Sequence, residues 1–162
     1  MARISINMLN ILIVCTGNSC RSIIGEAVFN HLGQGRIKAF SAGSNPKGRV
    51  NTGALNLLQR HELNTRNLSS KSWDILENQP FNIVITVCDN AAQETCPVYL
   101  SSAVKIHWTT AEPSHTKGGD NEILNAFEQT YKIFEQRIAT MLALPLDKMN
   151  RTELTRELNA IE

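Results

Sequence analysis

The sequence has almost no excess of charge of either sign. Its 16 Lys and Arg residues offset 15 Asp and Glu residues, which leaves a formal net charge of +1 at pH 7. A nucleic-acid-binding surface needs a basic stripe, and a charged tail needs a run of one sign, so we expect no nucleic-acid partner. Any selectivity for an anion must therefore come from a few groups gathered at one site.

Long hydrophobic runs are also missing. Before the first cysteine the chain has only the apolar run "ILIV" at 11–14, and no small-residue cleavage site follows it. A membrane helix needs about 20 apolar residues in a row, and a signal peptide needs an apolar core with a cleavage site. We expect no membrane association and a cytoplasmic location. The 162 residues, 42% of them hydrophobic, are enough for one domain over 1–162, in which 1–8 are frayed and 146–162 form a helical extension.

Cysteines are few, and none of the four belongs to a Cys-x-x-Cys pair. That absence makes a structural zinc site the weakest interpretation. Because a reducing compartment disfavours permanent disulfides, we expect these thiols to be reactive or simply buried. His31, His61 and His107 have no metal-ligand spacing with the cysteines, so no bound metal or cofactor is predicted.

The sequence does contain an alternation of strand and helix patterns. Predicted strands cover 10–15, 37–43, 82–88 and 103–108, and predicted helices cover 21–32, 51–63, 91–95, 121–144 and 150–161, with one more starting near Ser70. The strands at 10–15 and 82–88 are continuous apolar runs, typical of strands buried on both faces. Alternation of this kind indicates parallel pairing with helical crossovers. We predict an α/β fold, a three-layer α/β/α sandwich around a four-stranded parallel sheet.

Helix ends and faces follow from single residues. Asn51 is a predicted N-cap, and Asn150 with Glu153 has the spacing of a capping box. The longest predicted helix carries one apolar stripe, made of Leu124, Phe127, Tyr131, Phe134, Ile138 and Leu142.

In a parallel sheet of this kind, the ligand crevice lies beyond the carboxyl ends of the strands. Cys15 and Cys88 each end a predicted strand, and the segment after Trp108 follows a third. These three parts of the chain are therefore expected to meet at one edge of the sheet.

The segment "VCTGNSCRS", residues 14–22, links the first strand to the first helix with short polar residues and one glycine. Such a turn directs N–H groups inward and forms a nest for a tetrahedral oxyanion at the positive end of the helix. Gly17 permits a close backbone approach, Asn18 tolerates a left-handed conformation, and the Arg21 fork can hold two oxygens. The predicted oxyanion site consists of Thr16, Gly17, Asn18, Ser19, Cys20 and Arg21.

Cys15, at the start of this loop, is the predicted nucleophile. A helix N-terminus and a nearby Arg can lower a cysteine pKa from about 8.5 to between about 3.5 and 7.5, and Ser22 can donate a hydrogen bond to the sulfur. The alternative is a small buried residue at a strand end, with Arg21 a surface cation. The Cys-x5-Arg-Ser pattern between a buried strand and an amphipathic helix favours the reactive thiol.

The same loop resembles the phosphate-binding loop of the low-molecular-weight tyrosine phosphatases and of the arsenate reductases that share their fold. The similarity continues in "SAGSNPKG", "SSKSWDIL", "VCDNAAQETCP" and "HWTTAEP", and covers most of residues 9–144. The resemblance implies a phosphatase-like fold and binding of arsenate or phosphate. The loop alone does not distinguish a reductase from a phosphatase.

The later cysteines favour the reductase, because arsenate reduction needs two electrons that thiols can supply by forming a disulfide. Asp89 or Asn90 is predicted to cap a short helix that places Cys96 two turns beyond Cys88. The resemblance implies that Cys15 attacks arsenate, that Cys88 attacks the adduct and releases arsenite, and that Cys96 then attacks Cys88. Thioredoxin, or glutaredoxin with glutathione, would reduce the resulting disulfide.

Other interpretations of these thiols remain open. Cys88 and Cys96 can also be inert packing residues. Cys20 is expected to be a packing thiol rather than a member of the relay.

In this family an Asp followed by Pro, after the strand that ends in Trp, protonates the leaving oxygen. This chain has Glu112-Pro113 at the matching place, so Glu112 is the predicted acid. Its extra methylene moves the carboxyl by about 1 Å, a misplacement that can cost about a hundredfold in rate. His115 and Asp120 are nearby substitutes or solvated loop residues. The phosphatases that this chain resembles usually place aromatic residues beside this loop to hold phosphotyrosine. The loop "TTAEPSHTKGGDNE" has none, which disfavours a bulky aryl substrate.

Some thioredoxin-coupled reductases of this family hold a potassium ion through residues that match Asn18, Glu26 and Ser41. The further carboxylate expected near Ser70 is absent from this sequence, so the resemblance implies an incomplete cation site. Glu26 is interpreted as a group that braces the loop or is solvated.

Three functions are consistent with these observations. The first is a monomeric arsenate reductase that uses an external thiol reductant. The second is a phosphatase with a cysteinyl-phosphate intermediate, in which the later thiols serve redox control. The third is a non-catalytic oxyanion-binding protein.

Overall fold

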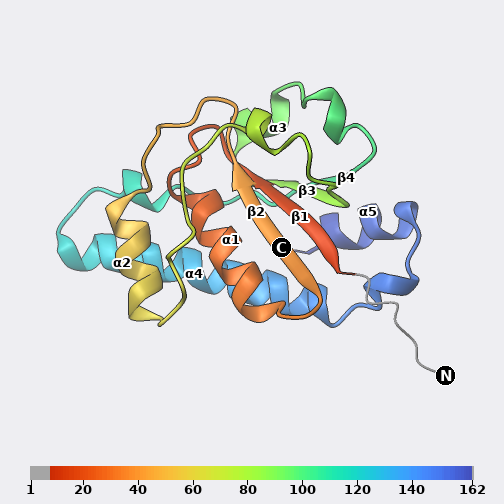
Figure 1. The fold of residues 1–162 in the computed structure, drawn as a ribbon. Helices are drawn as coiled ribbons and strands as arrows, with labels where there is room; N and C mark the ends of the chain where they lie inside the picture. The colour runs from red at the N-terminus through yellow and green to blue at the C-terminus, as the bar shows by residue number, and fades with distance from the viewer. Residues whose placement is uncertain (1–7, 162) are drawn as a thin grey trace.

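The computed structural model describes residues 8–161, so the predicted fraying of 1–8 lies, apart from residue 8, outside the described residues. Its four strands are β1 (Leu9–Val14), β2 (Ile37–Ala42), β3 (Ile83–Thr86) and β4 (Val104–His107). They form one all-parallel sheet in the order β2-β1-β3-β4 (Figure 1). The predicted α/β fold with a four-stranded parallel sheet is therefore confirmed.

The helices are α1 (Arg21–Leu32), α2 (Thr52–Arg60), α3 (Asp89–Gln93), α4 (Asp120–Leu142) and α5 (Arg151–Asn159). The first of these, α1, packs on β1 and β2 on one side and on α4 and α2 on the other, whereas α5 packs against β4 (Figure 1). Short 3-10 turns occupy Trp73–Leu76, Val98–Leu100, Pro113–His115 and Leu146–Lys148. In the part of the chain that the structure describes, no helix has the length and apolar character needed to cross a membrane.

The core forms around β1 and α1. The central residues of β1, Ile11–Val14, are completely buried, as the continuous apolar run predicts. Helix α1 is also buried along most of its length, because α4 covers the side that the sheet leaves open. A Cβ on Gly25 would lie 3.0 Å from Phe134 Cε1, so the small residue lets these two helices approach closely.

Three predictions about the elements are wrong. The helix predicted near Ser70 is only the 3-10 turn Trp73–Leu76, because a bridge between Gly43 and Ser72 holds the preceding residues in an extended conformation. Helix α3 begins at Asp89, and its N-cap is Cys88 rather than Asp89 or Asn90. Leu124, expected in the buried stripe of α4, is 43% exposed. It lies near the start of the helix, whereas the buried side chains of α4 begin at Phe127.

The caps predicted at Asn51 and Asn150 are confirmed. Asn51 accepts a hydrogen bond from the Ala54 backbone at 3.1 Å, and Asn150 with Glu153 forms a reciprocal capping box.

The C-terminal helix packs closely on the sheet edge. The Trp108 indole N–H donates to the Leu158 carbonyl at 2.9 Å, and the His107 backbone N–H donates to Asn159 Oδ1 at 3.1 Å. The Leu158 side chain is completely buried. Helix α5 therefore covers β4 and supports the start of the segment that follows it.

Candidate active site

The loop after β1, the loop after β3 and the segment after β4 meet at the carboxyl end of the sheet. They enclose a cavity of about 300 Å³. Its lining consists of Cys15, Thr16, Gly17, Asn18, Ser19, Cys20, Arg21, Lys47, Cys88, Asp89, Asn90, Glu112 and His115. The cavity thus gathers the residues predicted to bind an oxyanion together with two of the predicted relay thiols and the predicted acid.

The backbone of the loop directs its carbonyl groups away from the cavity. Three backbone N–H groups from 45–51 donate to the carbonyl oxygens of Thr16, Gly17 and Ser19, at 2.9 to 3.0 Å. The loop amides are then free to face inward, next to the N-terminus of α1. Such a ring of N–H groups at a helix N-terminus binds a tetrahedral anion.

The end of β2 lies directly behind this loop. A Cβ on Gly43 would lie 2.3 Å from the Thr16 carbonyl oxygen and 2.6 Å from that of Cys15. Contacts of that length are excluded, so only glycine fits. The strand end therefore sets the position of the nucleophile.

Asn18 fixes the turn from inside. Its φ of 42° lies in the left-handed region, as predicted, and its side chain is fully buried. Asn18 Nδ2 donates to Ser22 Oγ at 2.8 Å and to Ser41 Oγ at 2.9 Å, while Oδ1 accepts from the Lys71 backbone at 2.8 Å. The hydroxyl of Ser22 is thus tied to Asn18, and its predicted role toward Cys15 stays a prediction.

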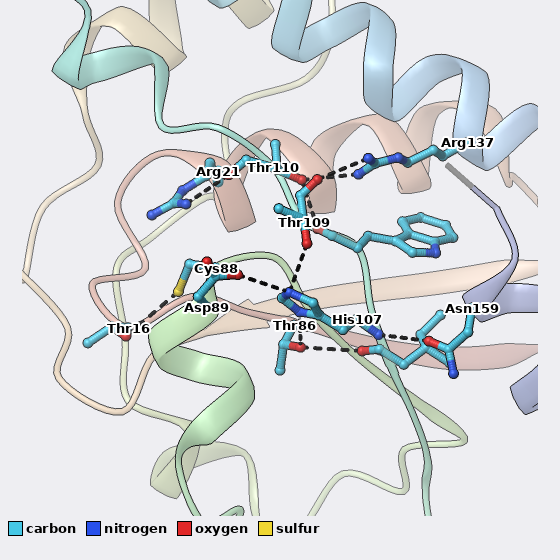
Figure 2. Close-up of polar contacts among 12 residues, drawn as sticks. Thr16, Arg21, Thr86, Cys88, Asp89, His107, Thr109, Thr110, Arg137 and Asn159 are labelled. Carbon is cyan, nitrogen blue, oxygen red and sulfur yellow. Dashed lines mark hydrogen bonds and ion pairs between the residues drawn. The ribbon is translucent and has the colours of Figure 1, made fainter.

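Arg21 is held in place at one end of its fork. Its Nη1 donates to the Thr110 carbonyl at 2.8 Å, and Arg137 in turn contacts Thr109 and Thr110 (Figure 2). The buried Nε–H of Arg21 has no hydrogen-bond acceptor within residues 8–161, and Glu112 Oε2 lies 3.6 Å away. A buried donor without an acceptor is costly, so this edge of the guanidinium is suited to an anion.

The thiols of Cys15 and Cys88 interact directly, although the two residues are 73 positions apart in the chain. This interaction is the largest effect lowering the pKa of Cys88 to about 5, and the Thr16 and Ala91 amides act in the same direction. The Thr16 hydroxyl also lies 3.7 Å from Cys88 Sγ (Figure 2). The interaction with Cys88 and burial raise the pKa of Cys15, against the effects of Arg21 and the Gly17 amide.

This pair corrects the expectation that Cys15 has the lowered pKa. The interaction raises the pKa of Cys15 and lowers that of Cys88, which favours the negative charge of the pair on Cys88. The two sulfurs titrate together and share one proton near neutral pH. Transfer of that proton from Cys15 to Cys88 places the charge on Cys15, beside Arg21.

Cys96 lies outside this cavity. It lines a second cavity of about 390 Å³, together with Lys105, His107 and Asn159. Cys88 caps the start of α3 and Cys96 follows its end. A five-residue helix alone spans about 7.5 Å, and a disulfide requires Cα atoms within roughly 4.4 to 6.8 Å. The two cysteines also line different cavities, so we expect a bond between them to need a change in the shape of α3.

Few polar contacts hold α3 in place. At its start, Asp89 Oδ1 lies 3.3 Å from His107 Nε2, and His107 Nδ1 lies 2.7 Å from Thr86 Oγ1 (Figure 2). Just past its end, Glu94 accepts hydrogen bonds from Thr16 at 3.3 Å and from Ser44 at 2.5 Å. The helix is thus attached at its two ends by single side chains.

Glu112 faces the cavity from the segment after β4. Its Oε1 accepts the Ser114 backbone N–H at 3.2 Å, which leaves Oε2 directed toward Arg21. Cys20 lies beside it, and burial together with the Glu112 carboxylate raises the pKa of the Cys20 thiol. Cys20 therefore stays protonated in the wall of the site, a state that suits the packing role expected for it.

Sequence reasoning missed part of this site. Lys47 lines the cavity, and a Cβ on Gly17 would lie 3.3 Å from its Cε. The segment "SNPKG" was recognised only by resemblance, and its contact with the loop is not visible in a single sequence. Arg137 was also missed, because it lies on α4, far along the chain from Thr110.

Groups of three or more His, Cys, Asp or Glu arranged to hold a metal do not occur within residues 8–161. His61 contacts Glu128 at 2.7 Å and stacks on Tyr131, so it has structural partners.

Comparison with known proteins shows sequence similarity to proteins of the family that the first loop resembles. A sequence profile described as "Low molecular weight phosphotyrosine protein phosphatase" matches residues 10–158. An arsenate reductase of Halalkalibacterium halodurans is 29% identical over 130 residues, which cover 80% of this chain and 92% of that protein.

Solved structures share the fold. One described as an arsenate reductase in the phosphate binding state superposes with a TM-score of 0.65 at 22% identity, over 82% of this chain and 98% of that one. The thioredoxin-dependent arsenate reductase Cg_ArsC1' of Corynebacterium glutamicum superposes with a TM-score of 0.58 at 20% identity, over 84% of this chain and 64% of that one. Given the profile match over most of its length, the chain belongs to the low molecular weight phosphotyrosine protein phosphatase family.

Proposed function

We propose that this protein is an arsenate reductase that works through a relay of Cys15, Cys88 and Cys96. The observation that carries the proposal is that the Cys15 and Cys88 thiols line the same oxyanion cavity and interact directly there. Phosphate-ester hydrolysis needs one thiol and a water, whereas reduction needs a second thiol within reach of the first. The similarity to curated arsenate reductases supports the same choice.

In the first step, arsenate binds to the loop amides and Arg21. The Cys15 proton moves to Cys88, and the Cys15 thiolate attacks the As(V) atom. The bond from arsenic to a hydroxyl group breaks, and Glu112, in its protonated carboxylic acid form, donates the proton with which that hydroxyl leaves as water. The product is a Cys15 thiol-arsenate still held by Arg21.

In the second step, Cys88 releases to solvent water the proton that it received from Cys15, and its thiolate attacks Cys15 Sγ. The S–S bond forms, and the S–As bond breaks with its electron pair moving to arsenic. Arsenic leaves as arsenite, As(III), and two thiols have been oxidised to one disulfide. The Cys96 thiolate then attacks Cys88 Sγ and frees Cys15, after rearrangement of α3.

An external dithiol closes the cycle by reducing the Cys88–Cys96 disulfide, with thioredoxin, or glutaredoxin with glutathione, as the candidates. The Corynebacterium glutamicum protein named as thioredoxin-dependent supports the former. No bound cofactor enters the cycle, and we propose a monomeric cytoplasmic enzyme.

A coupled assay tests the relay. NADPH consumption with arsenate is measured with thioredoxin and thioredoxin reductase, and in parallel with glutathione and glutaredoxin. Cys96→Ser is expected to release about one arsenite per protein and then stop, with a Cys15–Cys88 disulfide accumulated. Cys88→Ser is expected to release none. Unchanged multiple turnover by Cys96→Ser in both systems would contradict the relay.

The second candidate is a phosphatase, favoured by the family to which the profile assigns residues 10–158. The cavity has the features that a cysteinyl-phosphate intermediate requires, namely a thiol, an arginine and a carboxylate. Hydrolysis of phosphotyrosine or a small phosphate ester without any arsenate-dependent NADPH consumption would establish this function instead.

A further inference from the structure

A buried carboxylate lies behind the oxyanion loop. Glu26, in the middle of α1, is only 8% exposed. Its Oε1 accepts a hydrogen bond from Ser41 Oγ at 2.5 Å and lies 3.9 Å from Lys71 Nζ. Burial raises the pKa of Glu26 and lowers that of Lys71. The attraction between the two opposite charges acts against both shifts.

These groups connect directly to the loop. Ser41 Oγ, which donates to Glu26, accepts from Asn18 Nδ2, and the Lys71 backbone N–H donates to Asn18 Oδ1 at 2.8 Å. We call Asn18, Glu26, Ser41 and Lys71 the brace. Asn18 holds the left-handed turn of the oxyanion loop, so any rearrangement of the brace changes the positions of the loop amides.

The brace contains the residues that match a potassium site in some relatives of this fold, but here they do not fit a metal cation. Lys71 Nζ is held by the Ser69 carbonyl at 2.9 Å and faces Glu26, and its side chain is only 15% exposed. Asn18 Oδ1 is already occupied by a backbone N–H. A second cation beside Lys71 would leave an uncompensated positive charge in a buried site, which is strongly unfavourable.

We propose that Lys71 is a positioning residue whose ammonium group takes the place of a metal cation in the brace. Its ammonium group lies 3.9 Å from Glu26, which accepts the hydrogen bond of Ser41 and so orients Ser41 and Asn18. Because the cation is part of the chain, oxyanion binding is independent of potassium. The kinetic consequence rests on the proposed arsenate reduction, whereas the effect on phosphate binding does not.

The test removes the Lys71 ammonium group by substitution and supplies potassium ions in its place. Lys71→Ala is expected to weaken binding of inorganic phosphate, measured by calorimetry, by about tenfold, because small displacements of the loop are costly. The KM for arsenate is expected to rise by a similar factor in the coupled assay. Potassium chloride is expected to restore both values in Lys71→Ala, whereas tetramethylammonium chloride at equal ionic strength is not. The unmodified protein is expected to respond equally to the two salts.

Two further variants separate this role from simple packing. Glu26→Gln combined with Lys71→Ala is expected to lose the response to potassium, because the carboxylate that attracts the ion is gone. Lys132→Ala, an exposed lysine on α4, is expected to match the unmodified protein in both assays.

The outcomes are distinguishable. Potassium-dependent phosphate binding by Lys71→Ala without arsenate turnover in any variant would support the brace and contradict the proposed function. Phosphate binding that is unchanged in Lys71→Ala, or weakened equally in both salts, would overturn the proposal for Lys71.

Discussion

The interaction between the Cys15 and Cys88 thiols leads to a prediction about titration. Cys15→Ala removes the thiol whose interaction is the largest effect lowering the pKa of Cys88 to about 5. The pKa of Cys88 is therefore expected to rise toward the ordinary range of a thiol. Thiolate absorbance at 240 nm, followed against pH in proteins that also carry Cys20→Ala and Cys96→Ala, measures this change.

The protein with Cys15 intact serves as the control in that titration, and it should show a thiolate well below pH 7. A Cys88 titration curve that is identical with and without Cys15 would show that the amides of Thr16 and Ala91 alone stabilise the thiolate.

A second residue-scale prediction concerns Glu112. If its carboxyl protonates the leaving oxygen, Glu112→Gln is expected to lower kcat for arsenate by about 10² or more, the usual contribution of a general acid. Phosphate affinity should change much less, because the loop amides and Arg21 remain. Steady-state kinetics and calorimetry on the same preparation separate the two effects. An equal loss of binding and turnover would instead assign Glu112 to the orientation of Arg21.

At the scale of elements, helix α5 is expected to contribute substantially to stability. Leu158→Ala removes a completely buried side chain from its contact with β4 and is expected to lower the free energy of unfolding by about 2 to 5 kcal/mol. Leu124→Ala is a matched control, since Leu124 is 43% exposed, and should cost less than about 1 kcal/mol. Urea unfolding measures both, and similar values for the two variants would show that α5 is only loosely attached.

Elements that depend on neighbouring residues in the chain could be predicted from the sequence, whereas those that depend on distant partners could not. Strands β1 and β3 were predictable because burial on both faces requires a continuous apolar run. The cap at Asn51 was predictable because it acts over three residues. The extended course of 70–72 was not, because it depends on a bridge from Ser72 to Gly43, a partner that no local pattern reveals.

The same distinction applies to the site. The oxyanion loop is a contiguous motif, and its left-handed Asn18 was predictable from the residue type. The contact of Lys71 with Glu26 joins residues 45 positions apart in the chain. The shared proton of Cys15 and Cys88 likewise depends on the packing of two residues that are far apart in the sequence. Both follow only from the packed structure.

At the scale of the whole molecule, the relay predicts that oxidation loosens one region only. Joining Cys88 to Cys96 is expected to rearrange α3 and to break the contacts of Asp89 with His107 and of Glu94 with Thr16. Backbone amides of 89–96 are therefore expected to exchange hydrogen faster in the oxidised protein, by about tenfold or more, while those of α1 and α4 do not change. Mass spectrometry of both redox forms tests this, and equal exchange in 89–96 would contradict a rearrangement of α3.

The close packing of Gly43 against the Cys15 and Thr16 carbonyl oxygens restricts which residue other chains of this fold can have at this position. A side chain at that position cannot coexist with the loop in its binding shape, whatever the loop sequence. A chain that has the Cys-x5-Arg motif but another residue in place of this glycine is expected not to form the anion-binding pocket. The residue after the second strand therefore helps to distinguish chains that bind an oxyanion from chains that only contain the motif.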